Sequence, residues 1–309
     1  MADLKNVFSW SKSRDEEFRE CRRKYFYARY LSWGGWEARA ARDVRLAYIY
    51  KNLKNRFAWK GEAVHHTIEH VLKAARSGAP LPLEHALSQL TDTMRRDFRA
   101  SKAKKYLENP KNHLGLFEHE YEKPVSDEIW KKIHDEAAEC LRHFYNSALY
   151  AELLKDDVKK WLVVEDLEAF DFEGAKIFVK LDFAREKEDF TEIYDWKTGK
   201  DDPSADNSTQ IGAYVLYAMQ KWRLPVGKIR AYLLNLTSAK PVPRPQIVDE
   251  TLLIKARNTV RSSVQTMHAL LENVSENIPK SREEFSFTEN TRLCGFCNFY
   301  KICEKYAHA

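Results

Sequence analysis

Two aspartates and a lysine in the middle of the chain have the types and spacing of a cation-dependent hydrolytic site. Asp182 lies in the apolar run 179–184, and Asp195 precedes Lys197 by two positions in the run 193–199. A carboxylate at the end of an apolar strand is costly to bury unless it is paired or binds a cation. Side chains two residues apart share one face of a strand, so Asp195 and Lys197 should point the same way. Two carboxylates for Mg²⁺ or Mn²⁺ beside an ammonium group suit phosphodiester hydrolysis. A structural Asp–Lys pair is the alternative.

Four of the five cysteines could form a second, separate metal site. Cys294, Cys297 and Cys303 follow the spacing C-x2-C-x5-C, and three such thiolates need a fourth to complete a zinc site or an iron–sulfur cluster. Cys140 falls on the apolar face of an expected helix, where a cysteine usually acts as a small buried hydrophobe. That leaves Cys21. The cysteines alone leave both Zn²⁺ and a [4Fe–4S] cluster open.

The elements that must position these residues begin with a helical region. Helices are expected over residues 13–31, 59–76 and about 83–106. The clearest amphipathic helix covers residues 127–154 and has a cap at Ser126. Its predicted buried face contains Ile129, Ile133, Ala137, Cys140, Leu141, Phe144 and Ala148.

The second half changes character at Trp161. Short runs rich in β-branched and aromatic residues predict a three-stranded antiparallel meander over 161–164, 175–183 and 190–196. The expected elements that follow are a helix over 206–223, a strand over 228–236, a proline-rich turn, a short strand and a helix over 250–275. This order predicts an α/β (α+β) fold, in which a central mixed sheet with an antiparallel meander is flanked by helices.

Composition narrows the class of protein. Of 309 residues, 44% are hydrophobic and 31% charged, which is typical of a globular chain rather than a disordered one. The net charge of +5 permits nucleic-acid binding without requiring it. No apolar run approaches the roughly 18–20 residues that span a bilayer, and no signal-peptide pattern opens the chain. We therefore expect a cytoplasmic protein without a membrane partner.

The spacing of Asp182, Asp195 and Lys197 resembles the D-(x)n-(D/E)-x-K signature of the PD-(D/E)XK nucleases. Residues 194–199 (YDWKTG) resemble the D-Y-K-T-G of their RecB-like branch. The resemblance implies a restriction-endonuclease-like core with an N-terminal helical insertion, in which Lys197 positions or helps to deprotonate the attacking water. The usual G-x-x-D-R around the first aspartate is VKLDF here, so its glycine and arginine are absent.

Two further motifs of that branch have counterparts in this chain. Residues 61–65 (GEAVH) match G-x-x-x-H, whose histidine is a metal ligand; His66 is the adjacent alternative. Gln210 and Tyr214 match Q-x-x-x-Y, and their i, i+4 spacing places both on one helix face, where the family contacts DNA. The implied ligands of Mg²⁺ or Mn²⁺ are His65, Asp182, Asp195 and the carbonyl of Trp196.

The resemblance implies a metal-dependent DNA nuclease, an exonuclease on single-stranded DNA or DNA ends. A non-catalytic DNA-end-binding scaffold and an RNA-directed nuclease are the alternatives. Glu165 matches a glutamate of relatives; it would support the metal ligands from behind or be a strand-surface charge, and a catalytic role is disfavoured. The sequence has no Walker A loop, so a helicase or another ATP-driven partner would be a separate chain.

Residues 11–25 resemble the S-x-S-R…F/Y-x-x-C-P-R opening of the iron–sulfur members of this superfamily, although Arg22 replaces the proline. Those members include the AddB nuclease domain, the CRISPR-adaptation nucleases and the exonuclease V group, and adaptation proteins are therefore possible partners. The resemblance implies a [4Fe–4S] cluster on Cys21, Cys294, Cys297 and Cys303. We expect one domain, 1–309, with a clasp (1–32 and 285–309), a helical region (59–155) and a nuclease core (160–280).

Basic and aromatic residues alternate over residues 19–30 and gather again near Tyr300. Cations meet phosphates and aromatic rings stack on unpaired bases, as single-stranded nucleic acid requires. The alternative is that about half of these rings belong to the core.

Overall fold

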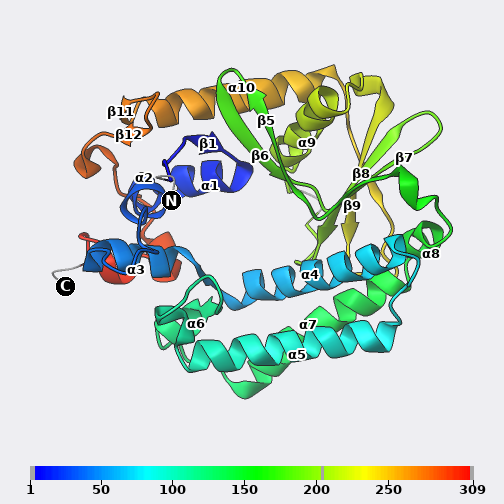
Figure 1. Ribbon diagram of the computed structural model, residues 1–309, viewed down its shortest axis with the longest axis horizontal. Coiled ribbons are helices and arrows are strands. Elements are labelled where there is room, and N and C mark those ends of the chain that lie inside the picture. The colour runs from blue at the N-terminus through cyan, green and yellow to red at the C-terminus, as the bar shows by residue number, and fades with distance from the viewer. Residues whose placement is uncertain (1–3, 203–204, 307–309) are drawn as a thin grey trace.

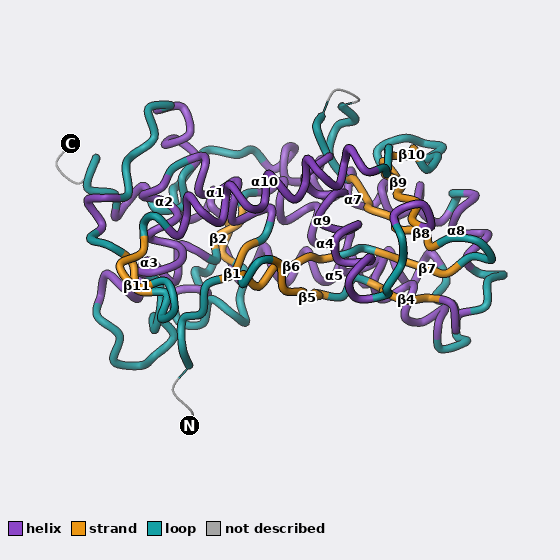
Figure 2. Tube along the Cα trace, turned by 90° about the horizontal axis from the view of Figure 1, so that it is seen from above, coloured by secondary structure: helices purple, strands orange, loops and turns teal. Residues whose placement is uncertain are grey.

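The computed structural model describes residues 4–202 and 205–306. Strands lie between two sets of helices in Figure 1, with α9 and α10 on one side and α4, α5 and α7 on the other. In Figure 2, α2, α3 and β11 gather at one end of the molecule, while β4, β7 and α8 lie at the other. No helix in the described part of the chain is long and apolar enough to cross a membrane.

The central sheet has five strands in the order β10-β9-β8-β7-β4. Its strands β8 and β9 pair in parallel, and the other neighbours are antiparallel. Helix α9 (Ser208–Lys221) provides the crossover that a parallel pair requires. The predicted mixed α/β fold with helices on both sides of the sheet is therefore confirmed. The five strands are β4 (Trp161–Val164), β7 (Phe183–Glu186), β8 (Thr191–Lys197), β9 (Ile229–Asn235) and β10 (Arg244–Gln246).

The predicted middle strand of the meander, 175–183, is wrong as a single strand. It is β6 (Ala175–Lys180) and β7, which belong to different sheets and are separated by a bend at Leu181 and Asp182. A second sheet, in the order β1-β6-β5, is built from Ser9–Trp10, β6 and Leu167–Phe172. Glu173 and Gly174 join β5 to β6 with positive φ angles of 49° and 81°, the backbone of a tight hairpin turn. Gly174 marked this turn in the sequence, but β5 carries too little alternation to be predicted.

The helical layer beneath the sheet contains α4 (Arg56–Arg76), α5 (Leu83–Lys102) and α7 (Asp127–Tyr145). Their apolar faces pack together and against one face of the central sheet, around Phe144, Phe183 and Trp196. The predicted helix over 127–154 is two helices, because Ser147 caps a new one, α8 (Ala148–Leu153). Ile129 and Ala148, predicted to be buried, are exposed.

The N-terminal segment is more broken than the predicted helix over 13–31. It consists of α1 (Lys12–Glu20), α2 (Arg22–Phe26) and one π-helical turn, Tyr27–Leu31. Cys21 interrupts the first two with an extended backbone, φ −164° and ψ 115°. Helix α3 (Arg42–Lys51) and the short parallel pair β2 (Leu53–Lys54) and β3 (Gly115–Leu116) follow, and neither was predicted.

Helix α10 (Glu250–His268) lies against α9 and is shorter than the predicted 250–275. Residues 271–275 instead enter a small hairpin of β11 (Leu271–Asn273) and β12 (Ile278–Pro279). Short 3₁₀ turns carry the chain from there back to α2. The Arg23 amide donates to the Ser286 carbonyl at 3.1 Å, and the Arg23 guanidinium lies 2.8 Å from Glu304. The two ends of the described chain are thereby held side by side.

Candidate active site

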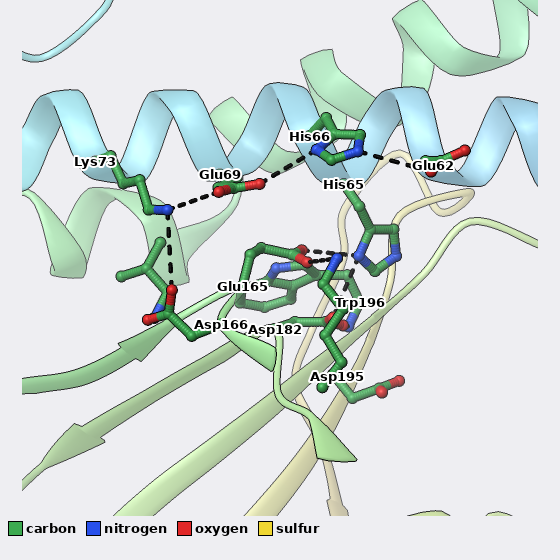
Figure 3. Close-up of polar contacts among 12 residues, drawn as sticks. Glu62, His65, His66, Glu69, Lys73, Glu165, Asp166, Asp182, Asp195 and Trp196 are labelled. Carbon is green, nitrogen blue, oxygen red and sulfur yellow. Dashed lines mark hydrogen bonds and ion pairs between the residues drawn. The ribbon is translucent and has the colours of Figure 1, made fainter. Parts of the chain in front are cut away.

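Three side chains from separate elements converge beside the end of the central sheet. They are His65 on α4, Glu165 just after β4 and Asp182 just before β7, and their ligand atoms lie within 4.8 Å of one another. Figure 3 shows the imidazole of His65 facing the two carboxylates. The Nδ1 atom of His65 is 2.8 Å from Glu165 Oε1 and 3.2 Å from Asp182 Oδ1.

The backbone fixes the two carboxylates next to each other. The Glu165 amide donates to the Asp182 carbonyl at 2.8 Å, which extends the β4–β7 ladder by one hydrogen bond. Glu165 has a positive φ of 56°, an uncommon conformation for a residue with a side chain. The Asp182 Oδ2 atom accepts a hydrogen bond of 2.6 Å from the Trp196 amide on β8. The predicted role for Trp196 was its carbonyl, whereas this contact uses its N–H group.

Helix α4 can bring His65 to this point because Gly61 lies one turn earlier. A Cβ atom at Gly61 would stand 3.1 Å from the Thr198 Oγ1 atom, just beyond the end of β8. The spacing Gly-x-x-x-His therefore has a packing reason, since the glycine lets the helix approach the strand end that carries the other motif. His66 points elsewhere: it is exposed and lies near Glu62 and Glu69 (Figure 3).

Asp195 belongs to a second, adjoining group of polar side chains. The Lys197 Nζ atom lies 2.7 Å from Asp195 Oδ2 and donates to Gln210 Oε1 at 2.9 Å. The Gln210 amide donates to Asp195 Oδ1 at 2.6 Å, and the Tyr214 hydroxyl lies 3.1 Å from the same oxygen. The expected strand and helix periodicities thus bring these four side chains together.

The two groups adjoin through the strand register. Phe183 pairs with Tyr194, so the same antiparallel register continued by one residue sets Asp182 opposite Asp195. The Asp195 carboxylate points away from His65 in Figure 3. Asp195 is therefore absent from the close ligand group, and Glu165, disfavoured from the sequence, takes a place in it.

Burial and close charges shift the protonation of the groups in the site. Burial raises the pKa of Asp182 to about 6; the nearby His65 opposes this rise and Asp195 adds to it. Burial works against protonation of His65, but Asp182 and Glu165 outweigh it and hold the pKa of His65 well above its usual range. Two buried carboxylate oxygens, Glu165 Oε2 and Asp195 Oδ2, accept no hydrogen bond from the described residues. Glu165 Oε2 lies 2.8 Å from the Lys180 ammonium group, and Asp195 Oδ2 lies 2.7 Å from that of Lys197. Such under-coordinated carboxylate oxygens are suitable ligands for a hard divalent cation.

The four cysteines predicted to act together line one cavity of about 230 Å³ between α2 and the C-terminal turns. Burial raises the pKa of the Cys297 thiol to about 11. Arg23 and Tyr27, beside this cavity, both contact Glu304. Cys140 is buried in the helical layer, away from the other four. The cavity-lining cysteines are Cys21, Cys294, Cys297 and Cys303.

The chain is similar to a known protein family over most of its length. The model of the PD-(D/E)XK nuclease superfamily matches residues 9–304. No curated protein matches the chain. A solved structure described as "Crystal structure of SSO0001" is 15% identical, with a TM-score of 0.30 over 62% of this chain and 79% of that one.

Proposed function

This chain belongs to the PD-(D/E)XK nuclease superfamily, and from that membership we propose that it is a metal-dependent exonuclease acting on single-stranded DNA or DNA ends. The observation that supports this most directly is the convergence of His65, Glu165 and Asp182 beside Asp195 and Lys197. The specific substrate follows from the resemblance to the RecB-like, iron–sulfur branch, whose motifs surround these residues.

His65, Asp182 and Glu165 would hold the Mg²⁺ or Mn²⁺ ion, with Asp195 at the adjoining position. Bound there, the ion would supply Lewis-acid activation of water and of the scissile phosphate. The donor set fits such an ion, because it offers several carboxylate oxygens and one imidazole within a small radius. Lys180, 2.8 Å from Glu165, offsets part of the negative charge while the site is free of metal.

Lys197 carries the second part of the proposed chemistry. Its ammonium group is held between Asp195 Oδ2 and Gln210 Oε1, so it cannot move far from the strand end. An ammonium fixed at this point stabilises the negative charge that develops on the phosphate oxygens. Gln210 and Tyr214 fix the orientation of the Asp195 carboxylate, and in this proposal they also guide the DNA strand.

The decisive test is digestion of end-labelled single- and double-stranded DNA with Mg²⁺ or Mn²⁺. We expect wild-type protein to shorten the label progressively and Asp195→Ala to leave it intact. Asp189→Ala is the matched control, since Asp189 is an exposed aspartate that no proposed role involves. DNA left uncut by the wild type, but bound equally by Asp195→Ala, would favour a scaffold role. Faster cutting of matched RNA would make the protein a ribonuclease.

The proposal includes a [4Fe–4S] cluster on Cys21, Cys294, Cys297 and Cys303. Four thiols in one cavity fit a four-thiolate group. A tetrahedral zinc site with Zn–S bonds of about 2.3 Å would bring the sulfurs to about 3.8 Å from one another. We propose the iron–sulfur cluster rather than zinc because residues 11–25 resemble the opening of the iron–sulfur members of the superfamily.

Anaerobically purified protein should absorb broadly at about 400 nm if thiolate-bound iron is present. Metal analysis that finds zinc and no iron would replace the cluster with a zinc site. Around either group, the proposed clasp is formed by segments 1–32 and 285–309, of which the structure describes 4–32 and 285–306.

A further inference from the structure

A second pocket, the basic pocket, lies outside the active site, among α1, the π-helical turn, α3 and β6. It has a volume of about 320 Å³, and no aspartate or glutamate is among its described lining residues. Several cations around one hollow, with Glu17 beside Arg29 as a nearby counter-charge, create a positive potential, which attracts anions. The basic residues that line it are Lys5, Arg14, Arg29, Lys51 and Lys176.

Most of this charge is not neutralised within the protein. Arg29 is paired, because its guanidinium lies 2.7 Å from Glu17. Lys51 and Lys176 form no ion pair with any carboxylate in the described chain. Lys51 retains access to solvent, yet burial and repulsion from Arg29 and Arg14 lower the pKa of its ammonium group to about 8. A bound anion would relieve this repulsion.

The pocket is connected to the active site along one face of β6. Side chains alternate along a strand, so Lys176, Phe178 and Lys180 share the outward face of β6, opposite the buried Ile177 and Val179. Lys180 contacts the active-site Glu165, whereas Lys176 lines the basic pocket. Four residues of strand separate the two lysines by about 13 Å.

Arg14 continues the same positive strip. Together with Phe178 it lines both the basic pocket and a neighbouring hollow that reaches Gln210 and Tyr214. The Arg14 guanidinium lies 5.8 Å from the Phe178 ring centre, and Lys176 Nζ lies 5.1 Å from the same ring. Two cations are therefore held at one aromatic ring that lines both hollows.

We infer that this pocket and the outward face of β6 form a phosphate-binding path for the substrate strand, with Lys51 and Lys176 contacting backbone phosphates beyond the scissile one. The inference rests on the proposed nuclease function and adds the direction from which the strand enters. A line of cations bridged by an aromatic ring suits a single strand, whose phosphates and unpaired bases are both accessible. The path ends where Lys180, Gln210 and Tyr214 meet the catalytic group.

The test is the affinity of the intact protein for a fluorescent single-stranded DNA oligonucleotide, measured in EDTA over a range of KCl concentrations. Each phosphate contact to single-stranded DNA contributes about 0.7 to the slope of log affinity against log salt. The double variant Lys51→Gln/Lys176→Gln should therefore lower the slope by about 1.4 and weaken binding about 25-fold at 0.1 M salt. The matched control is Lys228→Gln/Lys240→Gln, which removes the same charge from exposed positions outside the path.

The outcomes separate this inference from the proposed function. Equal slopes and affinities for the pocket variant and the control variant would overturn the path, even if the wild type cuts DNA. A loss of affinity confined to the pocket variant would support it, even if no cutting is seen, in which case the nuclease proposal alone would fail. Thermal melting of both double variants checks that each is folded, and Lys51→Arg/Lys176→Arg should restore the wild-type slope.

Discussion

Replacing Asp182 by asparagine should stabilise the metal-free protein while removing its response to metal. Asparagine has the shape of aspartate and keeps an oxygen that can accept the Trp196 N–H hydrogen bond. It removes a charge that is buried next to Glu165 and Asp195. The substitution therefore separates the stability cost of the site from its function.

The size of the effect follows from the pKa of Asp182, which burial raises from 3.8 to about 6. At about 1.4 kcal/mol per pH unit, keeping this carboxylate ionised in the folded protein costs at most about 3 kcal/mol. The figure is an upper limit, because the substitution also removes a carboxylate that favours protonated His65. Because the pKa of Asp182 is higher in the folded than in the unfolded protein, its protonated carboxyl stabilises the folded wild type. This contribution is complete below about pH 4. It is lost as the pH rises through about 6.

Thermal unfolding in EDTA at several pH values is the appropriate assay. At pH 8 the Asp182→Asn protein should melt up to about 5 °C higher than the wild type, given about 2.1 cal/mol/K of unfolding entropy per residue. At pH 4 the two should coincide. Mn²⁺ at one hundred times its dissociation constant should add about 2.7 kcal/mol to the wild type only. An equal or lower melting temperature for the variant at pH 8, or equal stabilisation by Mn²⁺, would refute the reasoning. Asp189→Asn, at an exposed position, should change neither quantity.

Three other substitutions test separate parts of the structure. Lys197→Met should lower the turnover rate by about 10²- to 10³-fold while Mn²⁺ binding by calorimetry stays intact; parallel loss of binding would assign the lysine a structural role. Cys297→Ser should abolish the absorption at about 400 nm and lower the melting temperature, whereas Cys140→Ser should keep the colour. Gly212→Ala should destabilise the fold by about 1–3 kcal/mol in urea unfolding, because its new Cβ would collide with α10. Gly227→Ala, where a Cβ meets nothing within 4 Å, is the control, and equal effects of the two would contradict this packing argument.

The elements carrying the motifs could be read from the sequence because local patterns determine them. The helix with His65, strand β8 and the helix with Gln210 and Tyr214 all follow from residue patterns that are local in the sequence. The approach of α4 to the end of β8 also had a local signal, Gly61, although its partner Thr198 lies far away in the sequence.

The remaining features depend on contacts between distant segments. Strand 175–183 divides between two sheets because β1 pairs with β6 across more than 160 residues, at Ser9 and Lys176. Glu165 enters the ligand group through one backbone hydrogen bond to Asp182, which no local pattern encodes. The basic pocket likewise combines α3, which was not predicted, with β6. Register and long-range pairing of this kind are set by tertiary packing rather than by propensity.

The parallel pairing of β1 with β6 also has a consequence for the order in which the chain can fold during synthesis. Ser9 leaves the ribosome long before its partner Lys176 exists. At about 5–20 residues per second, the first strand waits about 10–30 s for a sheet to join. The cysteines at positions 294, 297 and 303 are translated later still, so the thiol of Cys21 stays without these neighbours until residue 303 has been made. Any prosthetic group held by all four cysteines can therefore be completed only after residue 303 has been translated.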